Sequence, residues 1–203
     1  MYNNNCIYSR EFSKKPVTVP ALEVVTLAEQ KLFSRIDGDY EDTLIQTFIN
    51  SATSKCESYC NGGFALRDWE QNSDIGFLEN GNILEIKNLF IRSVSKLYLY
   101  DIDNAEYDVD SADFEVLGLD ESLPARILFN DDYIFPTPLR IKNAFKIEYS
   151  AGKTLLSDLL VIFPGVQIAI MSAVSTWYEF RETIKDIPEV SKILLDNLRI
   201  RYR

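Results

Sequence analysis

The stretch that decides the fold is Phe163–Thr183, with the sequence FPGVQIAIMSAVSTWYEFRET. Its apolar residues recur at steps of three and four, which is the spacing of one face of an α-helix. Pro164 suits the first helical position, where a missing backbone N–H costs nothing. We expect this helix to pack against the rest of the chain, because burying each large apolar side chain is worth roughly 1.5–3 kcal/mol. The residues predicted to line its buried face are Val166, Ile170, Ala173, Val174, Trp177, Phe180 and Ile184.

Two helices are predicted in the N-terminal part of the chain. Thr26 and Glu29 have the spacing of a capping box, and a short helix is expected over about 27–36. Asp39 is in position to cap a second helix over about 40–61. The second helix is predicted to bury a stripe of Leu44, Ile45, Phe48, Ile49, Ala52, Cys56 and Tyr59.

The middle of the chain has a different pattern. Between residues 66 and 149, short runs of β-prone residues alternate with turn signals. Asp103-Asn104 is predicted to be the turn of a hairpin, and Pro136 and Pro138 mark a loop. The predicted strands are Ile83–Ile86, Val94–Tyr100, Phe114–Leu117, Ala125–Phe129 and Ala144–Tyr149.

A last helix is predicted over about 188–200, with Val190, Ile193, Leu194 and Leu198 on its buried face. The chain is therefore expected to have an α+β fold, mainly a helical bundle of about four helices with a β-rich insertion between the second and third.

Residues 1–19 are polar and lack periodicity, and we expect them to form a flexible N-terminal arm. Residues 20–203 are expected to be a single domain with helices at 20–63, the β insertion at 64–152 and helices at 153–203.

Composition limits the classes of protein. With 203 residues, the chain has room for one domain or for one domain with an inserted subdomain. No apolar run reaches the length of a membrane span, and the N-terminus lacks the apolar core of a signal peptide. These features predict a soluble protein made in the cytoplasm, with no membrane partner. Cys6, Cys56 and Cys60 are expected to be reduced thiols, and they are too few for a zinc site.

The charge is concentrated in one segment. Residues 101–133 contain eleven acidic residues and only one basic residue, Arg126, so this segment carries −10. That equals the net charge of the whole chain, and the remainder is therefore close to neutral. A protein that grips nucleic acid phosphates usually has the opposite balance.

The sequence contains no complete nucleotide-binding, calcium-binding or catalytic motif. Ala151–Thr154 is similar to the end of a phosphate-binding loop, but Ile147 stands where that loop needs a glycine. Asp101–Ala105 is similar to the start of a calcium loop, but Ala105 replaces a ligand. The chain has no histidine, the commonest general base. We therefore predict no catalytic, cofactor-binding or metal-binding residues. A carboxylate-based hydrolase and a monomeric interaction domain remain as alternatives.

Three motifs occur in a fixed order along the chain. The first comprises Val25–Lys31, Arg35–Asp39 and the pair Glu41-Asp42, followed by a long helix. The second, Lys146–Gly152, has the form of a strand that ends in a YxAG turn. The third is the helix from Pro164 to Arg181, which ends in WYEFR. Together they resemble the phage head–tail connector (adaptor) proteins of long-tailed phages and gene transfer agents. The segment 155–163 is longer than the turn that this family usually has there.

The resemblance implies a structural role and no catalysis. It implies a homo-oligomeric ring, typically a dodecamer, that sits beneath the portal protein of a filled capsid and receives a tail or stopper protein on its other face. Genomic DNA passes through the centre without specific binding. The protein would be assembled in the host cytoplasm and reside in the virion at the head–tail interface. An acidic channel wall suits this role because it repels phosphates. The candidate channel-facing acids are Asp101, Asp103, Asp108, Asp110 and Asp113.

The end of the chain reverses the sign of the charge. Arginines alternate there with apolar residues, a composition typical of interface anchors. In the connector family that this chain resembles, the C-terminal region commonly reaches the portal. We therefore expect docking on the portal through Arg199, Ile200, Arg201, Tyr202 and Arg203. The alternative is that Arg199 and Arg201 cap the last helix, where cations favour the negative end of the dipole.

Overall fold

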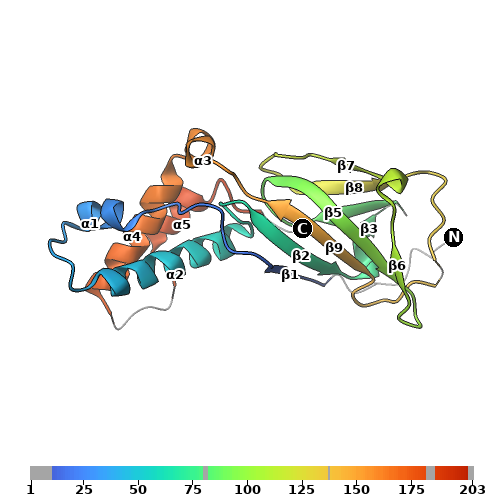
Figure 1. The fold of residues 1–203 in the computed structure, drawn as a ribbon, viewed down its shortest axis with the longest axis horizontal. Helices are drawn as coiled ribbons and strands as arrows, with labels where there is room; N and C mark the ends of the chain where they lie inside the picture. Colours follow the sequence, from blue (N-terminus) through green and yellow to red (C-terminus); the bar gives the residue numbers. More distant parts are fainter. Residues whose placement is uncertain (1–10, 80–81, 137, 182–185, 201–203) are drawn as a thin grey trace. The chain divides into compact units, whose positions relative to one another are not determined.

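The structure is a computed structural model that describes residues 11–79, 82–136, 138–181 and 186–200. The chain divides into two compact units. The sheet unit contains the N-terminal residues up to Val19 together with Arg67–Ala151, and the helical unit contains Pro20–Leu66 together with the chain from Gly152 onward. Figure 1 shows the helices and strands that belong to the two units.

The α+β prediction is confirmed, with the β-rich region between the second and third helices. The helical unit has five helices among its described residues, one more than expected, because part of the segment before Pro164 is also helical. The helices are α1 (Leu27–Ser34), α2 (Asp42–Cys60), α3 (Leu156–Ile162), α4 (Gly165–Glu179) and α5 (Glu189–Leu195).

The first turn of α1 has the predicted capping box. The Thr26 hydroxyl accepts from the backbone N–H of Glu29 at 3.3 Å, and the Glu29 carboxylate accepts from the backbone N–H of Thr26 at 2.8 Å. The cap predicted for α2 is wrong, since the residue at that position is Glu41 and not Asp39. Asp39 instead pairs with Lys31 at 2.8 Å, so its carboxylate serves α1.

Helix α4 buries most of the predicted stripe. Val166, Ile170, Ala173, Val174 and Trp177 are all buried. The prediction fails at the C-terminal end because α4 stops at Glu179, which leaves Phe180 61% exposed. Ile184 lies outside the described residues.

The face predicted for the last helix is wrong. Val190, Ile193 and Leu194 are 58%, 66% and 36% exposed, and of the predicted set only Leu198 is buried. The buried side of α5 instead carries Ser191, whose hydroxyl donates to the backbone oxygen of Ala169 in α4 at 2.7 Å. The apolar pattern predicted the wrong face of α5, because a polar residue, Ser191, makes this buried contact.

Among the described residues, no single helix is long and apolar enough to cross a membrane. Helices α3 and α4 reach that length and composition only as a pair, and the pair is bent by 99°.

The sheet unit contains two antiparallel sheets. The five-stranded sheet has the order β1-β2-β9-β5-β6, and the four-stranded sheet has the order β3-β4-β8-β7. The first sheet consists of β1 (Phe12–Pro16), β2 (Arg67–Ser73), β5 (Ile91–Tyr100), β6 (Glu106–Asp108) and β9 (Phe145–Ala151). The second consists of β3 (Leu78–Glu79), β4 (Ile83–Ile86), β7 (Phe114–Leu117) and β8 (Ala125–Phe129).

Strand β1 lies in the segment expected to be a flexible arm, and the structure differs from that expectation. Phe12–Pro16 pair in register with Trp69–Ser73 of β2. The pairing continues beyond the strand, since the backbone N–H of Val17 donates to the oxygen of Asp68 at 2.8 Å.

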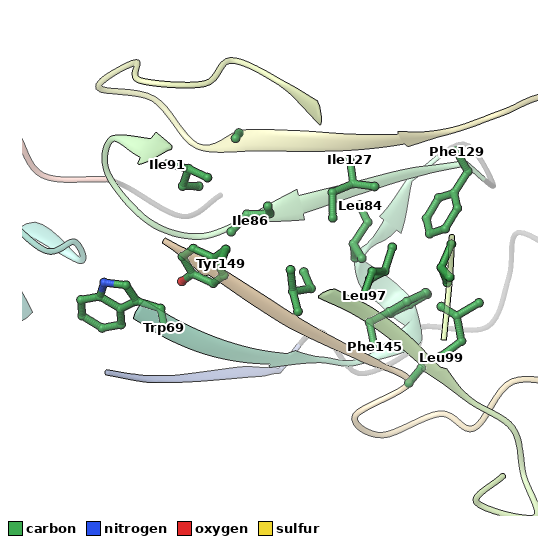
Figure 2. Close-up of a cluster of buried hydrophobic side chains, with 14 of the residues drawn as sticks. Trp69, Leu84, Ile86, Ile91, Leu97, Leu99, Ile127, Phe129, Phe145 and Tyr149 are labelled. Atoms are coloured by element: carbon green, nitrogen blue, oxygen red, sulfur yellow. The ribbon is translucent and has the colours of Figure 1, made fainter. Parts of the chain in front are cut away.

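A single hydrophobic core fills the sheet unit. Strand β9 alternates buried and half-buried residues along its whole length, as expected for a strand with one face on a core. Its inward side chains Phe145, Ile147 and Tyr149 belong to the same cluster as Leu84 of β4 and Ile127 of β8. Figure 2 shows side chains of both sheets in this cluster. The predicted strands therefore supply most of the core.

Candidate functional site

The motif residues of the helical unit come together in the structure. Lys31 pairs with Asp42 at 2.7 Å, which ties α1 to the start of α2. Arg181 pairs with Glu41 at 2.6 Å, and the Tyr178 hydroxyl donates to the same carboxylate. We call these five residues the motif clasp. It joins the first and third motifs, which are more than a hundred residues apart in sequence.

The clasp shifts the pKa values of its members. Hydrogen bonds from Tyr178 and then from Arg181 lower the pKa of the Glu41 carboxyl. The bond to Glu41 in turn raises the pKa of the Tyr178 hydroxyl. The pKa of Lys31 is raised, mainly by its hydrogen bonds to Asp39 and Asp42. These pKa shifts favour an ionised Glu41, a protonated Tyr178 and a charged Lys31, which are the states that make the contacts of the motif clasp.

We expect Glu41→Gln to destabilise the helical unit at neutral pH and to have little effect in acid. Because folding lowers the pKa of Glu41, its contribution is present above the unfolded value of about 4.5 and is lost as the pH falls through the folded value. Urea denaturation of both proteins between pH 3 and pH 8 measures this difference. Glu179→Gln, which removes one exposed carboxylate from the end of α4, is the matched control. A stability difference independent of pH would contradict the assignment.

The five candidate channel acids lie on one hairpin and the turn after it. Asp101 accepts from the backbone N–H groups of Asp103 and Ala105, both at 2.9 Å, and from the Tyr107 hydroxyl. The bond from Ala105 is the largest cause that lowers the pKa of Asp101. Asn104, with φ at 61°, turns the chain, so the predicted hairpin turn is confirmed.

The other candidate acids have different surroundings. Asp108 in β6 pairs with Lys96 in β5 at 3.2 Å, and Asp103 is exposed. Asp110 accepts from the backbone N–H of Ala112 at 3.0 Å and begins the short helical turn Ser111–Asp113. The hairpin is therefore an acidic part of the sheet unit, with a turn that is held by hydrogen bonds to Asp101. Within the described residues, no group of three or more histidine, cysteine, aspartate or glutamate side chains is placed to hold a metal ion.

The C-terminal segment binds its own chain as far as residue 200. The backbone N–H of Ile200 donates to the oxygen of Cys60 at 3.0 Å, and the Asn61 amide donates to the oxygen of Ile200 at 2.9 Å. The Arg199 guanidinium stacks on the Tyr59 ring at 4.7 Å. Ile200 is 8% exposed and therefore packs in the helical unit. The remaining docking candidates, Arg201, Tyr202 and Arg203, lie outside the described residues.

These contacts also bear on the alternative role of Arg199 as a helix cap. Helix α5 ends at Leu195, and Arg199 is a full turn beyond it. The Arg199 guanidinium instead lies over the ring of Tyr59, near the C-terminus of α2, and the Tyr59 hydroxyl donates to Asp196 at 2.7 Å. Arg199 therefore fastens the end of the chain to α2.

Two of the cysteines are inert by position. Cys56 and Cys60 are free and buried on α2. Burial raises the pKa of the Cys56 thiol to about 12 and raises that of Cys60 as well. Since the thiolate is the reactive form, neither is suited to nucleophilic or redox chemistry. Cys6 lies outside the described residues.

Sequence reasoning missed an unusual feature of α1. Its one buried side chain is polar, since Gln30 is 0% exposed and donates to Ser34, to Ser175 and to the backbone oxygen of Met171. Its large apolar side chains Leu32 and Phe33 are 81% and 45% exposed. The adjacent leucine and phenylalanine lie on the same side of the helix as the exposed capping residue Glu29, and this position was the available signal.

Residues 24–97 match the family described as phage gp6-like head-tail connector protein. The resemblance inferred from the sequence is therefore confirmed over these residues. The family is one of structural connectors and not of enzymes, so the match gives no support to the alternative of a hydrolase. None of the curated proteins matches the chain.

Solved structures share the fold along almost the whole chain. A chain from the neck of an empty gene transfer agent (GTA) particle, computed with C6 symmetry, has 18% identity and a TM-score of 0.70. A chain from the virion of a native GTA particle has 18% identity and a TM-score of 0.68. A chain from the neck of a native GTA particle, computed with C12 symmetry, has 17% identity and a TM-score of 0.66. Each match covers 94% of this chain and 97% of the other.

Proposed function

We propose, on the premise that residues 24–97 are those of a phage gp6-like head–tail connector, that the protein forms a ring in the neck of a virion. The ring sits beneath the portal, receives a tail or stopper protein on its other side, and lets DNA pass through its centre. The observation that carries this proposal is a fold shared with GTA neck chains over 94% of the sequence. The C6 and C12 symmetry of those necks supports a ring of about a dozen copies.

The charge distribution supports the role of a passive conduit. The acidic hairpin of the sheet unit carries Asp101, Asp103 and Asp108, and the whole segment 101–133 carries −10. If this surface lines the channel, it repels the phosphates of passing DNA, so that the DNA moves without sticking. The neutral remainder of the chain is then left for protein contacts.

Reconstitution tests the proposal. Purified protein is added to DNA-filled capsids that carry the portal but lack the connector, and the neck is imaged by electron microscopy. We expect a ring of density at the portal and the recovery of tail attachment. Folded protein that leaves the portal bare would contradict the proposal.

Removal of Arg201–Arg203 is expected to abolish attachment to these capsids without loss of stability. An arginine guanidinium can donate two parallel hydrogen bonds to one carboxylate. Because a ring repeats each contact around its axis, even a weak contact gives strong attachment by avidity. A longer deletion would also remove Leu198 and Ile200, which are buried in the helical unit, and would confuse unfolding with loss of docking. Co-sedimentation with capsids measures attachment, and circular dichroism checks the fold.

A matched control removes positive charge from another place. Arg92→Ala with Arg126→Ala takes two exposed arginines from the sheet unit and should leave attachment unchanged. Normal attachment of the protein that lacks 201–203 would rule out the docking role of this tail.

The intact protein is expected not to bind duplex DNA, even at about 50 mM salt, where phosphate contacts are strongest. Fluorescence anisotropy with a labelled duplex measures binding. A variant with Asp103→Lys and Asp108→Lys on the acidic hairpin should bind more tightly than the wild type, because it adds cations where the wild type repels phosphate. Tight, salt-sensitive binding by the wild type would contradict a passive channel wall.

A further inference from the structure

Two groups of exposed apolar side chains lie on different helices of the helical unit. The first, the α1 face, consists of Leu32, Phe33 and Tyr40, which are 81%, 45% and 104% exposed. Tyr40 is held near α1 because Lys31 pairs with Asp39. The polar residue Gln30 attaches α1 to α4, so the fully buried contact of this helix is polar while Leu32 and Phe33 stay exposed. This is the reverse of an ordinary surface helix.

The second, the α3–α5 face, consists of five exposed aliphatic residues. Leu194 of α5 lies next to the start of α4, since a Cβ added at Gly165 would be 3.5 Å from its side chain. The end of α3, three residues before Gly165, is therefore beside the C-terminal end of α5. The members of this face are Val161, Ile162, Val190, Ile193 and Leu194, which are 83%, 43%, 58%, 66% and 36% exposed.

The two faces lie on different sides of α4. Helix α1 contacts α4 at Met171 and Ser175, whereas α5 contacts it at Gly165 and Ala169. At 100° per residue, these two sets of positions are about 120° apart around the helix. Figure 1 shows α1 and α5 on either side of α4.

Each face has the apolar area of an interface. At about 200 Å² for a fully exposed large side chain, the exposed fractions correspond to roughly 500 Å² on either face. A standard interface buries about 800 Å² per partner, of which about 60% is apolar. Both faces therefore match, in area, what one side of a stable protein contact requires.

A ring explains why there are two such faces. Identical copies around a rotation axis meet head to tail, so each copy needs two different surfaces that fit each other. Resting on the ring of the proposed function, we propose that the α1 face of one copy packs on the α3–α5 face of the next. The partner of both faces is thus a second copy of this chain, and the contact repeats around the ring.

Charge-swap variants of the full chain test the pairing. Leu32→Glu alone and Ile193→Lys alone each place an unpaired charge in the contact, and each should weaken self-association by about tenfold or more. The double variant pairs the two charges across the contact and should associate within about threefold of the wild type. Sedimentation velocity measures association, and circular dichroism checks the fold. Ile134→Glu, at an 88% exposed position of the sheet unit, is the control and should change nothing. A double variant no better than the single ones overturns the proposal.

Cross-linking covers the case of weak association. In a Cys6→Ser background, Phe33→Cys with Ile193→Cys should give a ladder of oligomers on oxidation at high concentration. Either cysteine alone should give dimers at most. Absence of the ladder overturns the proposal. Both tests use the purified protein, so protein that self-associates as expected but does not attach to capsids refutes the proposed function and leaves this contact standing.

Discussion

Trp177→Ala is expected to lower the free energy of unfolding of the helical unit by about 3–5 kcal/mol. Trp177 is 2% exposed and meets the Phe48 ring of α2 edge-on, with the ring centroids 6.5 Å apart. Its indole N–H donates to the backbone oxygen of Asp186 at 3.1 Å. The substitution leaves a cavity between α2 and α4 and removes the hydrogen bond that holds the chain just before α5.

Chemical denaturation followed by circular dichroism measures this effect. Phe180→Ala is the matched control, because this aromatic residue is three positions later and 61% exposed. Its cost should stay below about 1 kcal/mol. A loss below about 1 kcal/mol for Trp177→Ala would mean that the indole lies at a surface, contrary to the structure.

Gly152→Ala is expected to destabilise the chain by about 3–5 kcal/mol or to prevent its folding. Gly152 has φ at +110°, a conformation that side chains rarely adopt. An added Cβ would lie 2.3 Å from the backbone oxygen of Ala65 and 2.7 Å from the nitrogen of Leu66. The backbone of Ala65 and Leu66 cannot move aside as a flexible side chain would. The unfavourable φ of residue 152 and the steric overlap of the new Cβ therefore both destabilise the variant.

Gly118→Ala separates these two causes. Gly118 also has positive φ, at +78°, but the atom nearest to an added Cβ is 3.7 Å away. Its substitution should cost only the conformational strain, about 1–2 kcal/mol. Thermal and urea denaturation of both variants provide the comparison. Equal effects at the two glycines would show that close approach to Ala65 does not matter.

The regular parts of the fold could be predicted from the sequence. Strands β4, β7 and β8 have the predicted bounds, because their apolar residues alternate between turn signals. Strand β2 was missed because its buried side chains include Gln71 and Ser73, which bond each other at 2.9 Å. A strand whose inward-facing side chains are polar shows no alternation of hydrophobic residues, so its sequence does not predict a strand.

The candidate site could be predicted only as separate pieces. The resemblance identified Glu41 and Arg181 as parts of two motifs, but their 2.6 Å contact depends on how α2 and α4 pack. The sequence also did not predict which apolar side chains are exposed. Ile193 and Ile200 look alike in sequence, yet Ile193 is 66% exposed and Ile200 is 8% exposed. Apolar residues also lie on the outside of this helical unit, so periodicity alone cannot distinguish its core from its surface.

The helical unit is built from two segments of the chain, before and after the sheet strands Arg67–Ala151, and this fixes the order in which its helices are synthesised. Helix α2 is complete at Cys60, but α4 begins at Gly165, about 100 residues later. At about 5–20 residues per second, the ribosome needs ~5–20 s to supply the partner of α2. The sheet strands from β2 to β9 are made in this interval. When they pair, they bring the chain back to its starting point, where Lys153 meets Phe64 and Leu66 through backbone bonds of 2.8 and 2.9 Å. In the folded chain these bonds place the segment that leads into α4 next to the segment that follows α2.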